Sequence, residues 1–382
     1  MMSESEIFEP GASSATRKDR ALLDTAAGRM APMRASRMHG IRELRLEELP
    51  RPTPGPGEVL LAVLCVGVCG SDVHYYLHGR IGSQVVTEPI MLGHEFSARV
   101  AGLGAGVEGL ATGQLVAVDP AISCGACEPC LQGHPNLCPN VLFCGTPPVN
   151  GVFAEYVVMP VANCYPLPGE IGPVEGAMLE PLGIALHSVD LAHLKPGQTV
   201  AVLGAGPIGL LVAAVARAGG AAEVYMTEPL AYRRQFALDY VADAALDPAV
   251  PDPLAGDVVA EILRLTGGRG VDVAFEAAGA PETPQQAAAV TRIGGKVILV
   301  GIAPDEHLTF QADTLRHKGL TVKLVRRMKH TYPRTIRLVQ TGRVDLKPLA
   351  SHLFPLERIV DAFETVASYE DGVLRAVIQI SE

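Results

Sequence analysis

Four cysteines lie close together along the chain, at Cys124, Cys127, Cys130 and Cys138. Their spacing is C-x2-C-x2-C-x7-C, in a turn-rich stretch where four thiolates can surround one tetrahedral zinc ion. Four cysteines can also hold an iron–sulfur cluster, but the bacterial cluster spacing has three residues, not seven, before the last cysteine. The pattern favours a structural zinc site, because four protein ligands leave no position for a substrate.

A second set of metal-ligating side chains is spread more widely. Cys69 follows a strand-like run, His94 and Glu95 come 25 residues after it, and Glu180 lies further along the chain. A catalytic zinc needs three protein ligands and one open position, and these residue types meet that need. A single cysteine or histidine is more often a packed structural residue, so these residues alone do not decide whether a metal binds here.

A glycine-rich segment, Gly204-Ala-Gly206-Pro207-Ile208-Gly209, follows the apolar run 199–203, and a helical pattern begins directly after it. The first glycine permits a tight turn, and the second lets the backbone approach a pyrophosphate. The third lets the helix pack closely on the sheet, and the helix N-terminus faces the phosphate charge. In this strand–loop–helix context the motif predicts a dinucleotide site.

Glu228 stands at the end of the next strand-like run, where a carboxylate binds the ribose hydroxyls and repels a 2′-phosphate. This favours NAD over NADP, although Arg233 and Arg234 follow closely and could weaken the preference. The residues predicted to bind the cofactor are Gly204, Gly206, Pro207, Ile208, Gly209, Glu228 and Arg233.

The elements that position these residues fall into two kinds. Residues 33–186 hold short strand-like runs separated by glycine and proline, which predict a small barrel-like domain. Residues 187–325 alternate strands and helices, one of which is a helical stretch that reaches Arg292, and this predicts a parallel sheet covered on both faces. Residues 326–382, with a helical run at 335–341 and a final strand, are assigned to the first domain because the six-strand alternation is complete by Val325. Residues 1–32 lack periodicity and are predicted to be a disordered extension, unless translation begins near Met33.

Composition narrows the function classes. The chain has 382 residues, enough for two domains, with 48% hydrophobic and 19% charged residues. Its formal net charge of -10 argues against a nucleic-acid partner. No apolar run approaches the ~20 residues of a membrane helix, and residues 1–32 have no apolar core of a secretory signal. We therefore expect a cytoplasmic protein whose clustered cysteines bind metal rather than form disulfides.

Several sequence motifs are specific enough to indicate a protein family. The run CGSDVHYYLHGRIG, followed by PIMLGHE, resembles the sorbitol and xylitol dehydrogenases of the zinc-containing medium-chain dehydrogenase/reductase superfamily. The similarity continues through the four-cysteine segment, FCGTPPVNGVFAEYV, EPLGIALH, GAGPIG and HTYPRTI, and covers the chain from Met33 to its C-terminus. The resemblance implies an α/β protein with a GroES-like, β-rich catalytic domain and a Rossmann domain with a doubly wound parallel sheet.

The resemblance also implies an activity, which is oxidation of a secondary hydroxyl of a polyol to a ketose with transfer of hydride to NAD. One catalytic and one structural zinc ion and a homodimer or homotetramer are usual in this family. The catalytic zinc is held by the residues matching Cys69, His94 and Glu95, with water in the fourth position. The residue matching Glu180 lies close by, either hydrogen-bonded to that water or able to ligate. Alcohol dehydrogenases of the superfamily generally have cysteine there, so Glu180 favours a polyol enzyme.

The resemblance extends to the substrate pocket. Ser71 and His74 match the residues that pass the substrate proton toward solvent and the cofactor ribose. The residues matching the pocket lining are Tyr75, Phe143, Thr146, Glu180 and Arg327. Polyol dehydrogenases commonly have Arg-Tyr-x-Asn at the last of these positions, whereas this chain has Arg-Met-Lys-His from Arg327 to His330, which leaves the preferred polyol open.

Two other functions compete with this interpretation. One is a related zinc dehydrogenase for threonine or another secondary alcohol. The other is a protein that binds the cofactor without catalysis, such as a lens-crystallin-like protein or a redox sensor. Such proteins can lose the metal ligands, whereas Cys69, His94, Glu95 and Glu180 are all present.

Overall fold

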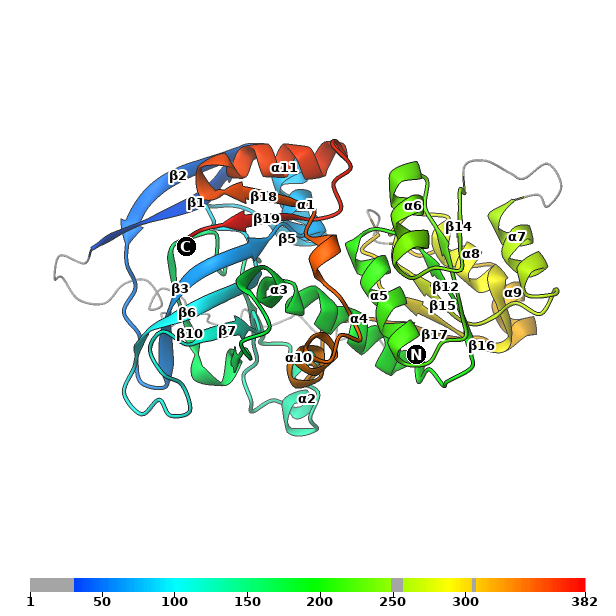
Figure 1. The fold of residues 1–382 in the computed structure, drawn as a ribbon, viewed down its shortest axis with the longest axis horizontal. Helices are drawn as coiled ribbons and strands as arrows, with labels where there is room; N and C mark the ends of the chain where they lie inside the picture. Colours follow the sequence, from blue (N-terminus) through cyan, green and yellow to red (C-terminus); the bar gives the residue numbers. More distant parts are fainter. Residues whose placement is uncertain (1–30, 249–256, 304–306, 382) are drawn as a thin grey trace, which may run out of the picture.

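The first half of the chain builds a seven-stranded sheet from runs rich in β-branched residues (Figure 1). The computed structural model describes residues 31–248, 257–303 and 307–381. Within these ranges β3 (Glu58–Gly67) is the central strand and pairs antiparallel with its neighbours. In spatial order the strands are β11 (Cys164–Pro166), β7 (Leu115–Val118), β6 (Glu95–Leu103), β3, β19 (Ala376–Gln379) and β18 (His352–Pro355), and β10 (Tyr156–Pro160) also pairs with β3. The C-terminal segment thus completes the sheet that the first strands begin.

Shorter elements surround this sheet. β1 (Pro32–Gly40) and β2 (Glu43–Pro50) form an antiparallel hairpin. Four short strands form two further pairs, β4 (Arg80–Ile81) with β5 (Gln84–Val85) and β8 (Ala121–Ile122) with β9 (Leu142–Phe143). This half of the molecule also includes the C-terminal segment. Its helices are α1 (Gly70–His78), α2 (Glu128–Leu131), η1 (Pro135–Leu137), η2 (Val161–Asn163), α3 (Pro173–Ala177), α10 (Tyr332–Gln340), η3 (Lys347–Leu349), η4 (Leu356–Arg358) and α11 (Ile359–Ser368).

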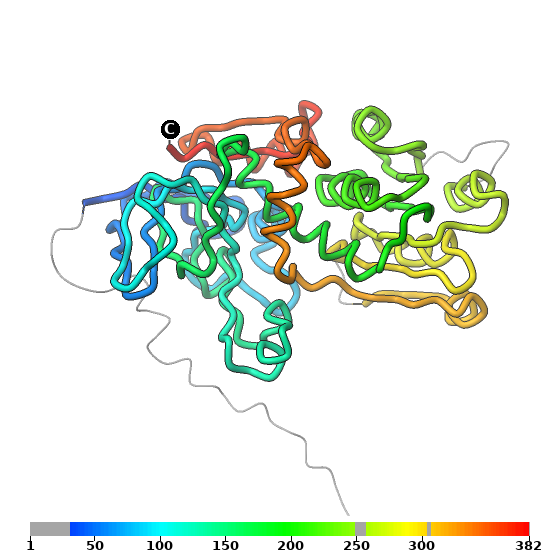
Figure 2. The backbone as a smooth tube through the Cα atoms, turned by 60° about the horizontal axis from the view of Figure 1, so that its bottom comes forward, coloured from blue at the N-terminus to red at the C-terminus, as the bar shows by residue number. Residues whose placement is uncertain are grey.

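A lobe of residues 123–141, which we call the four-cysteine lobe, protrudes from this half and contains α2 and η1 (Figures 1 and 2). The β8–β9 pair closes its base, because the two strands flank the lobe in the sequence and hydrogen-bond to each other.

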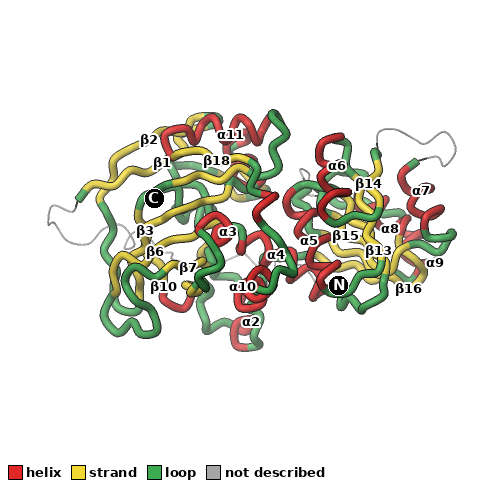
Figure 3. The backbone as a smooth tube through the Cα atoms, in the orientation of Figure 1, coloured by secondary structure: helices red, strands yellow, loops and turns green. Residues whose placement is uncertain are grey.

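The second half forms a six-stranded sheet in which all strands run parallel. Its order is β14 (Ala244–Leu246), β13 (Glu223–Thr227), β12 (Thr199–Leu203), β15 (Val271–Glu276), β16 (Thr291–Leu299) and β17 (Thr321–Leu324). The flanking helices are α5 (Pro207–Ala218), α6 (Ala231–Tyr240), α7 (Val258–Leu265), α8 (Thr283–Val290) and α9 (Ala312–Lys318) (Figure 3). The strand order reverses between β12 and β15, and ligands of such sheets bind beyond the carboxyl ends of the strands at this switch point.

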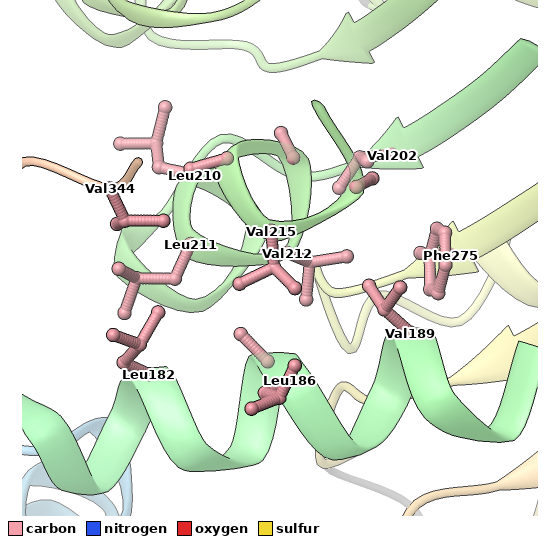
Figure 4. Packing of buried hydrophobic residues seen from close by; sticks show 14 of the residues in the cluster. Leu182, Leu186, Val189, Val202, Leu210, Leu211, Val212, Val215, Phe275 and Val344 are labelled. Atoms are coloured by element: carbon pink, nitrogen blue, oxygen red, sulfur yellow. The ribbon is translucent and has the colours of Figure 1, made fainter. Parts of the chain in front are cut away.

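Helix α4 (Leu179–Ala192) joins the two halves through a shared core. Leu182, Leu186 and Val189 on α4 face Leu211 and Val215 on α5 (Figure 4). The same buried cluster extends to apolar residues of β12, β15 and α10. Because α4 is anchored on both sides, its first turn, which carries Glu180, has a fixed place between the two sheets.

The predicted fold class is confirmed, and the differences lie at element ends. The helical run predicted at 335–341 begins earlier, at Tyr332, because Pro333 in the first turn needs no hydrogen-bond partner for its nitrogen. The helix expected to reach Arg292 ends at Val290, and β16 begins at Thr291. Residues 1–30 of the predicted extension 1–32 lie outside the described residues. Strand β1 begins at Pro32, the last residue of that extension. None of the helices in the described ranges is long and apolar enough to cross a membrane.

Candidate active site

The four-cysteine lobe brings all four of its sulfur atoms together. Within the lobe the Sγ atoms of Cys127 and Cys130 are 3.3 Å apart, those of Cys127 and Cys138 3.7 Å, and those of Cys138 and Cys124 3.5 Å. Zn–S bonds of ~2.3 Å in a tetrahedron place sulfurs roughly 3.8 Å apart, so these distances fit a single zinc ion. Sulfurs bound to different irons of a cluster would lie further apart. The lobe therefore fits the predicted structural zinc.

The second group of ligands assembles where β3, α1 and β6 meet. Cys69 is the N-cap of α1, and His94 and Glu95 stand at the start of β6. One ligand atom from each of the three residues lies within 4.8 Å of the others. Gly67 pairs with Glu95 across the two strands, and a Cβ atom at Gly67 would overlap the Glu95 carboxylate. Glycine at that position leaves the space that the buried carboxylate occupies, and the three donors fit the predicted catalytic zinc.

Asp72, which the sequence analysis did not assign to the site, ties the two ligand segments together. Its side chain is 1% exposed and accepts hydrogen bonds from the backbone N–H groups of Cys69 at 3.0 Å and Gly93 at 2.9 Å. Burial lowers the pKa of His94, but the nearby Asp72 carboxylate and Cys69 thiol outweigh burial and raise it well above its usual value. Asp72 therefore fixes both ligand segments and supplies negative charge beside His94, as outer partners of metal ligands do.

Arg375 is the second partner that sequence reasoning missed. It directly precedes β19, is 3% exposed, and forms an ion pair with the equally buried Glu95. Burial lowers the pKa of Arg375, while the negative groups around it oppose that effect. One signal was available, because Arg375 is a lone charge in the apolar run 373–380. Charged side chains are almost never fully buried unless they are paired.

Glu180 lies in the first turn of α4 and is 4% exposed. It is not part of the three-residue group whose ligand atoms lie within 4.8 Å of one another. Burial raises the pKa of Glu180 to about 8, although the positive charges of His94 and Arg327 oppose the shift. A carboxyl group with such a pKa can hold or release a proton near neutral pH.

The residues predicted to line the substrate pocket gather beside His94. The ring of Phe143 lies 5.1 Å from the His94 ring, measured between centroids, and the Arg327 guanidinium lies 4.6 Å above the Phe143 ring. The hydroxyl of Tyr75 donates to Gln84 at 3.3 Å, and burial raises the pKa of Tyr75, an effect that the nearby Thr146 side chain opposes.

Two further predicted residues follow Cys69 on α1. Ser71 and His74 are both half-buried, and burial lowers the pKa of His74. A neutral imidazole of this kind can accept a proton.

The glycine-rich segment forms the loop between β12 and α5, as predicted. Gly206 is the N-cap of α5, and Pro207 and Ile208 begin the helix. A Cβ atom at Gly209 would overlap the carbonyl oxygen of Gly204, so the close approach of helix and loop requires glycine there. Gly204, Gly206, Glu228 and Arg233 line one cleft of about 580 Å³.

Glu228 is tied to the backbone of this loop. Its carboxylate accepts hydrogen bonds from the N–H groups of Ala205 at 3.0 Å and Leu230 at 3.1 Å. Arg234 donates to the carbonyl of Glu228 and pairs with Asp247 at 2.9 Å. The Arg234 guanidinium is therefore already engaged by Glu228 and Asp247, and Arg234 is not among the residues that line the cleft.

Arg233 joins the cleft to the other half of the molecule. Its Nη2 donates to the carbonyl of Val373 at 3.2 Å, and the neighbouring Tyr232 hydroxyl donates to the same oxygen at 2.9 Å. The guanidinium lies 5.0 Å from the ring centroid of Tyr369, a further cleft residue that the sequence analysis did not single out. The positive charge of Arg233 suits a pyrophosphate on the adjacent loop.

Known proteins are similar to this chain in sequence and in fold. The profile of the alcohol dehydrogenase GroES-like domain matches residues 55–169, and that of zinc-binding dehydrogenase matches residues 207–341. The chain is 37% identical to sorbitol dehydrogenase of Bacillus subtilis (strain 168), over 91% of this chain and 97% of that protein. It is 40% identical to D-xylulose reductase A of Aspergillus niger, over 86% of this chain and 92% of that protein.

A solved structure agrees with these matches. The crystal structure of 2R,3R-butanediol dehydrogenase from Bacillus subtilis is similar with a TM-score of 0.82 and 33% identity, covering 91% of this chain and 100% of that chain. The predicted family resemblance is confirmed, and the chain belongs to the zinc-binding dehydrogenases with a GroES-like domain, in the group that includes sorbitol dehydrogenase and D-xylulose reductase.

Proposed function

We propose that this chain oxidises a secondary hydroxyl of a small polyol, such as xylitol or sorbitol, to a ketose. The observation that carries the proposal is the group of half-buried Cys69 with buried His94 and Glu95, and Glu180 as a second buried carboxyl near His94. The relatives named sorbitol dehydrogenase and D-xylulose reductase support the polyol as substrate class. Oxidation of threonine or another secondary alcohol is the alternative.

Each residue has a proposed part in this reaction. Cys69, His94 and Glu95 would hold a zinc ion, which would supply polarisation of the substrate hydroxyl, and the cleft beside residues 204–209 would hold NAD as the hydride acceptor. The proton of the substrate hydroxyl leaves through Ser71 and His74, or through water on Glu180, whose pKa burial raises to about 8.

The pocket residues then select the substrate. Tyr75, Thr146 and Arg327 offer hydrogen-bonding groups to the other hydroxyls of a polyol. The ring of Phe143 covers His94 and keeps water from this side of the site.

We infer a preference for NAD over NADP. Glu228, buried at the end of β13, supports this preference because its negative charge repels a 2′-phosphate. Three inferences stay predictions. The first is the division into a catalytic domain of residues 33–186 with 326–382 and a cofactor domain of residues 187–325. The others are a cytoplasmic location and assembly into dimers or tetramers.

A substrate panel tests the proposal. Reduction of NAD and of NADP is measured with xylitol, sorbitol, ribitol, galactitol, glycerol, threonine and ethanol, and zinc is determined on the same sample. We expect turnover of a five- or six-carbon polyol with NAD and two zinc ions per chain, one for each ligand group. Activity on threonine or ethanol alone would replace the substrate class, and zinc near one per chain without turnover would favour a non-catalytic protein.

A further inference from the structure

The four-cysteine lobe makes a buried contact with the segment that carries Arg327. Asn136, in η1 of the lobe, is 6% exposed, and its Nδ2 donates a hydrogen bond to the backbone carbonyl of Arg326 at 3.0 Å. The two residues are 190 positions apart in the sequence. A second link lies nearer the surface, where the Lys329 ammonium donates to Nδ1 of His134 at 3.0 Å. The lobe therefore holds this segment on both sides of Arg327.

The segment needs such support because its backbone is strained. Arg327 has a φ of 53° and His330 a φ of 49°, in the left-handed region that non-glycine residues seldom adopt. Conformations of this kind are energetically unfavourable and persist only where the surroundings enforce them. The hydrogen bond from Asn136 acts on the peptide unit that leads directly into Arg327.

The strained backbone directs Arg327 into the site. Its guanidinium lies over the ring of Phe143, and that ring lies beside His94. Phe143 belongs to β9, which closes the base of the same lobe. Nη1 of Arg327 is buried and has no hydrogen-bond partner among the residues that the structure describes. A buried donor without a partner is costly, so a ligand hydroxyl is a suitable acceptor for it.

We propose that the four-cysteine lobe positions the substrate pocket, and that Asn136 is the positioning residue through which it acts. By holding the Arg326 carbonyl, Asn136 keeps Arg327 in the left-handed conformation that places its guanidinium over Phe143. The inference rests on the proposed function, because Arg327 meets the substrate only if the substrate is a polyol bound beside His94. The four-cysteine lobe thus contributes to substrate binding in addition to its own stability.

A double-mutant cycle between Asn136 and Arg327 tests the inference. Asn136→Leu removes the donor at nearly constant volume, and Arg327→Ala removes the side chain that it positions. For each variant, kcat and KM for the best polyol, NADH affinity by fluorescence titration, zinc content and thermal unfolding are measured. Gln132→Ala is the control, because Gln132 lies in the same lobe but is exposed, and its side chain hydrogen-bonds only to Glu128 among described residues.

We expect Asn136→Leu to raise the KM for the polyol about tenfold, the effect of one buried hydrogen bond, with NADH affinity and zinc content unchanged. In the Arg327→Ala background the same substitution should change KM less than about twofold, because residues that act as a unit are not additive. Gln132→Ala should leave all values unchanged. Equal effects of Asn136→Leu in the two backgrounds, or no effect in the wild-type background, would overturn the inference.

The outcomes separate this inference from the proposed function. If Arg327→Ala leaves polyol kinetics unchanged, Arg327 is not a substrate contact, and both its proposed part and the inference fall. If Arg327→Ala raises KM but Asn136→Leu does not, only the inference falls. Should Asn136→Leu fail to fold, Lys329→Met at the exposed link carries the test. It should raise KM roughly two- to threefold, and only while Arg327 is present, whereas an unchanged KM would overturn the inference.

Discussion

The two sites of the molecule are built by different means. In the six-stranded half, the cofactor cleft is centred on the loop 204–209 and on Glu228, which binds two backbone N–H groups, and Tyr369 of the other half also lines it. In the other half, the ligand group comes from Cys69 and from the pair His94 and Glu95, and side chains hold these ligands in place. The first site relies mostly on backbone shape and the second on buried side-chain charges.

This difference decides how each site responds to substitution. A backbone-built site spreads its binding energy over several N–H groups that survive the loss of one side chain. A site built from buried charged side chains has no such reserve, because removing one partner leaves the other unpaired. We therefore expect a substitution in the metal group to abolish nearly all activity. A substitution in the cofactor cleft should only weaken cofactor binding.

The largest effect is expected for His94→Ala. His94 is one of three ligands, and without it the chain should lose the metal's stabilisation of the reacting oxygen, worth several kcal/mol. Turnover of the polyol should fall by at least about a thousandfold. NADH affinity should stay unchanged, because His94 is not among the residues that line the cofactor cleft. Steady-state kinetics, zinc content and an NADH fluorescence titration measure these quantities.

His317→Ala is the matched control, since His317 is an exposed histidine on α9 that pairs with Asp313. It should retain full turnover and zinc content. Substantial turnover in His94→Ala would contradict the assignment of the metal group, and a parallel loss of NADH affinity would remove the contrast between the two sites.

A graded effect is expected for Glu228→Ala. The substitution removes the carboxylate that is predicted to bind the ribose, but the loop N–H groups remain. Affinity for NAD should fall about tenfold, and the preference over NADP should narrow, because a negative charge no longer repels the 2′-phosphate. Kinetics with both cofactors measure the change, and Glu223→Ala, at an exposed position at the start of β13, is the control. Unchanged NAD affinity would refute the role of Glu228.

The same contrast explains what could be predicted from the sequence. The loop 204–209 is contiguous and stands between a strand and a helix, so its pattern is complete within a few residues. The metal group joins positions far apart, and its ligand set followed from the resemblance to a family rather than from spacing. Asp72 and Arg375 were missed, because their roles depend on which strands become neighbours in the sheet.

Asn136 was beyond prediction for the same reason. Its partner is the carbonyl of Arg326, a backbone atom that no sequence pattern marks, in a segment 190 positions away. The fold class was predictable, because alternation of strands and helices is a local property, and the errors at α8 and α10 were confined to helix ends.

The smallest effect on catalysis is expected for Asp272→Asn, although Asp272 is also buried and charged. It lies near the start of β15, whereas the glycine loop follows the carboxyl end of the adjacent parallel strand β12. Its carboxylate accepts hydrogen bonds from Arg269 at 2.7 Å, from Arg292 at 2.6 Å and from the Thr199 N–H at 3.0 Å. The substitution should cost about 1–3 kcal/mol of unfolding free energy and leave the kinetics with NAD and polyol unchanged.

The pH dependence of unfolding tests this assignment. Burial raises the pKa of Asp272, but the hydrogen bonds from Arg269, Arg292 and Thr199 outweigh burial and hold it well below its usual range. A carboxyl group with a lowered pKa in the folded state stabilises the protein above its unfolded pKa of about 4, and this contribution is lost as the pH falls below that value. The difference in unfolding temperature between wild type and Asp272→Asn should therefore be constant near neutral pH and shrink below about pH 4. A difference that does not depend on pH would show that the Asp272 charge does not stabilise the sheet, and a changed KM for NAD would show that Asp272 affects the cofactor cleft.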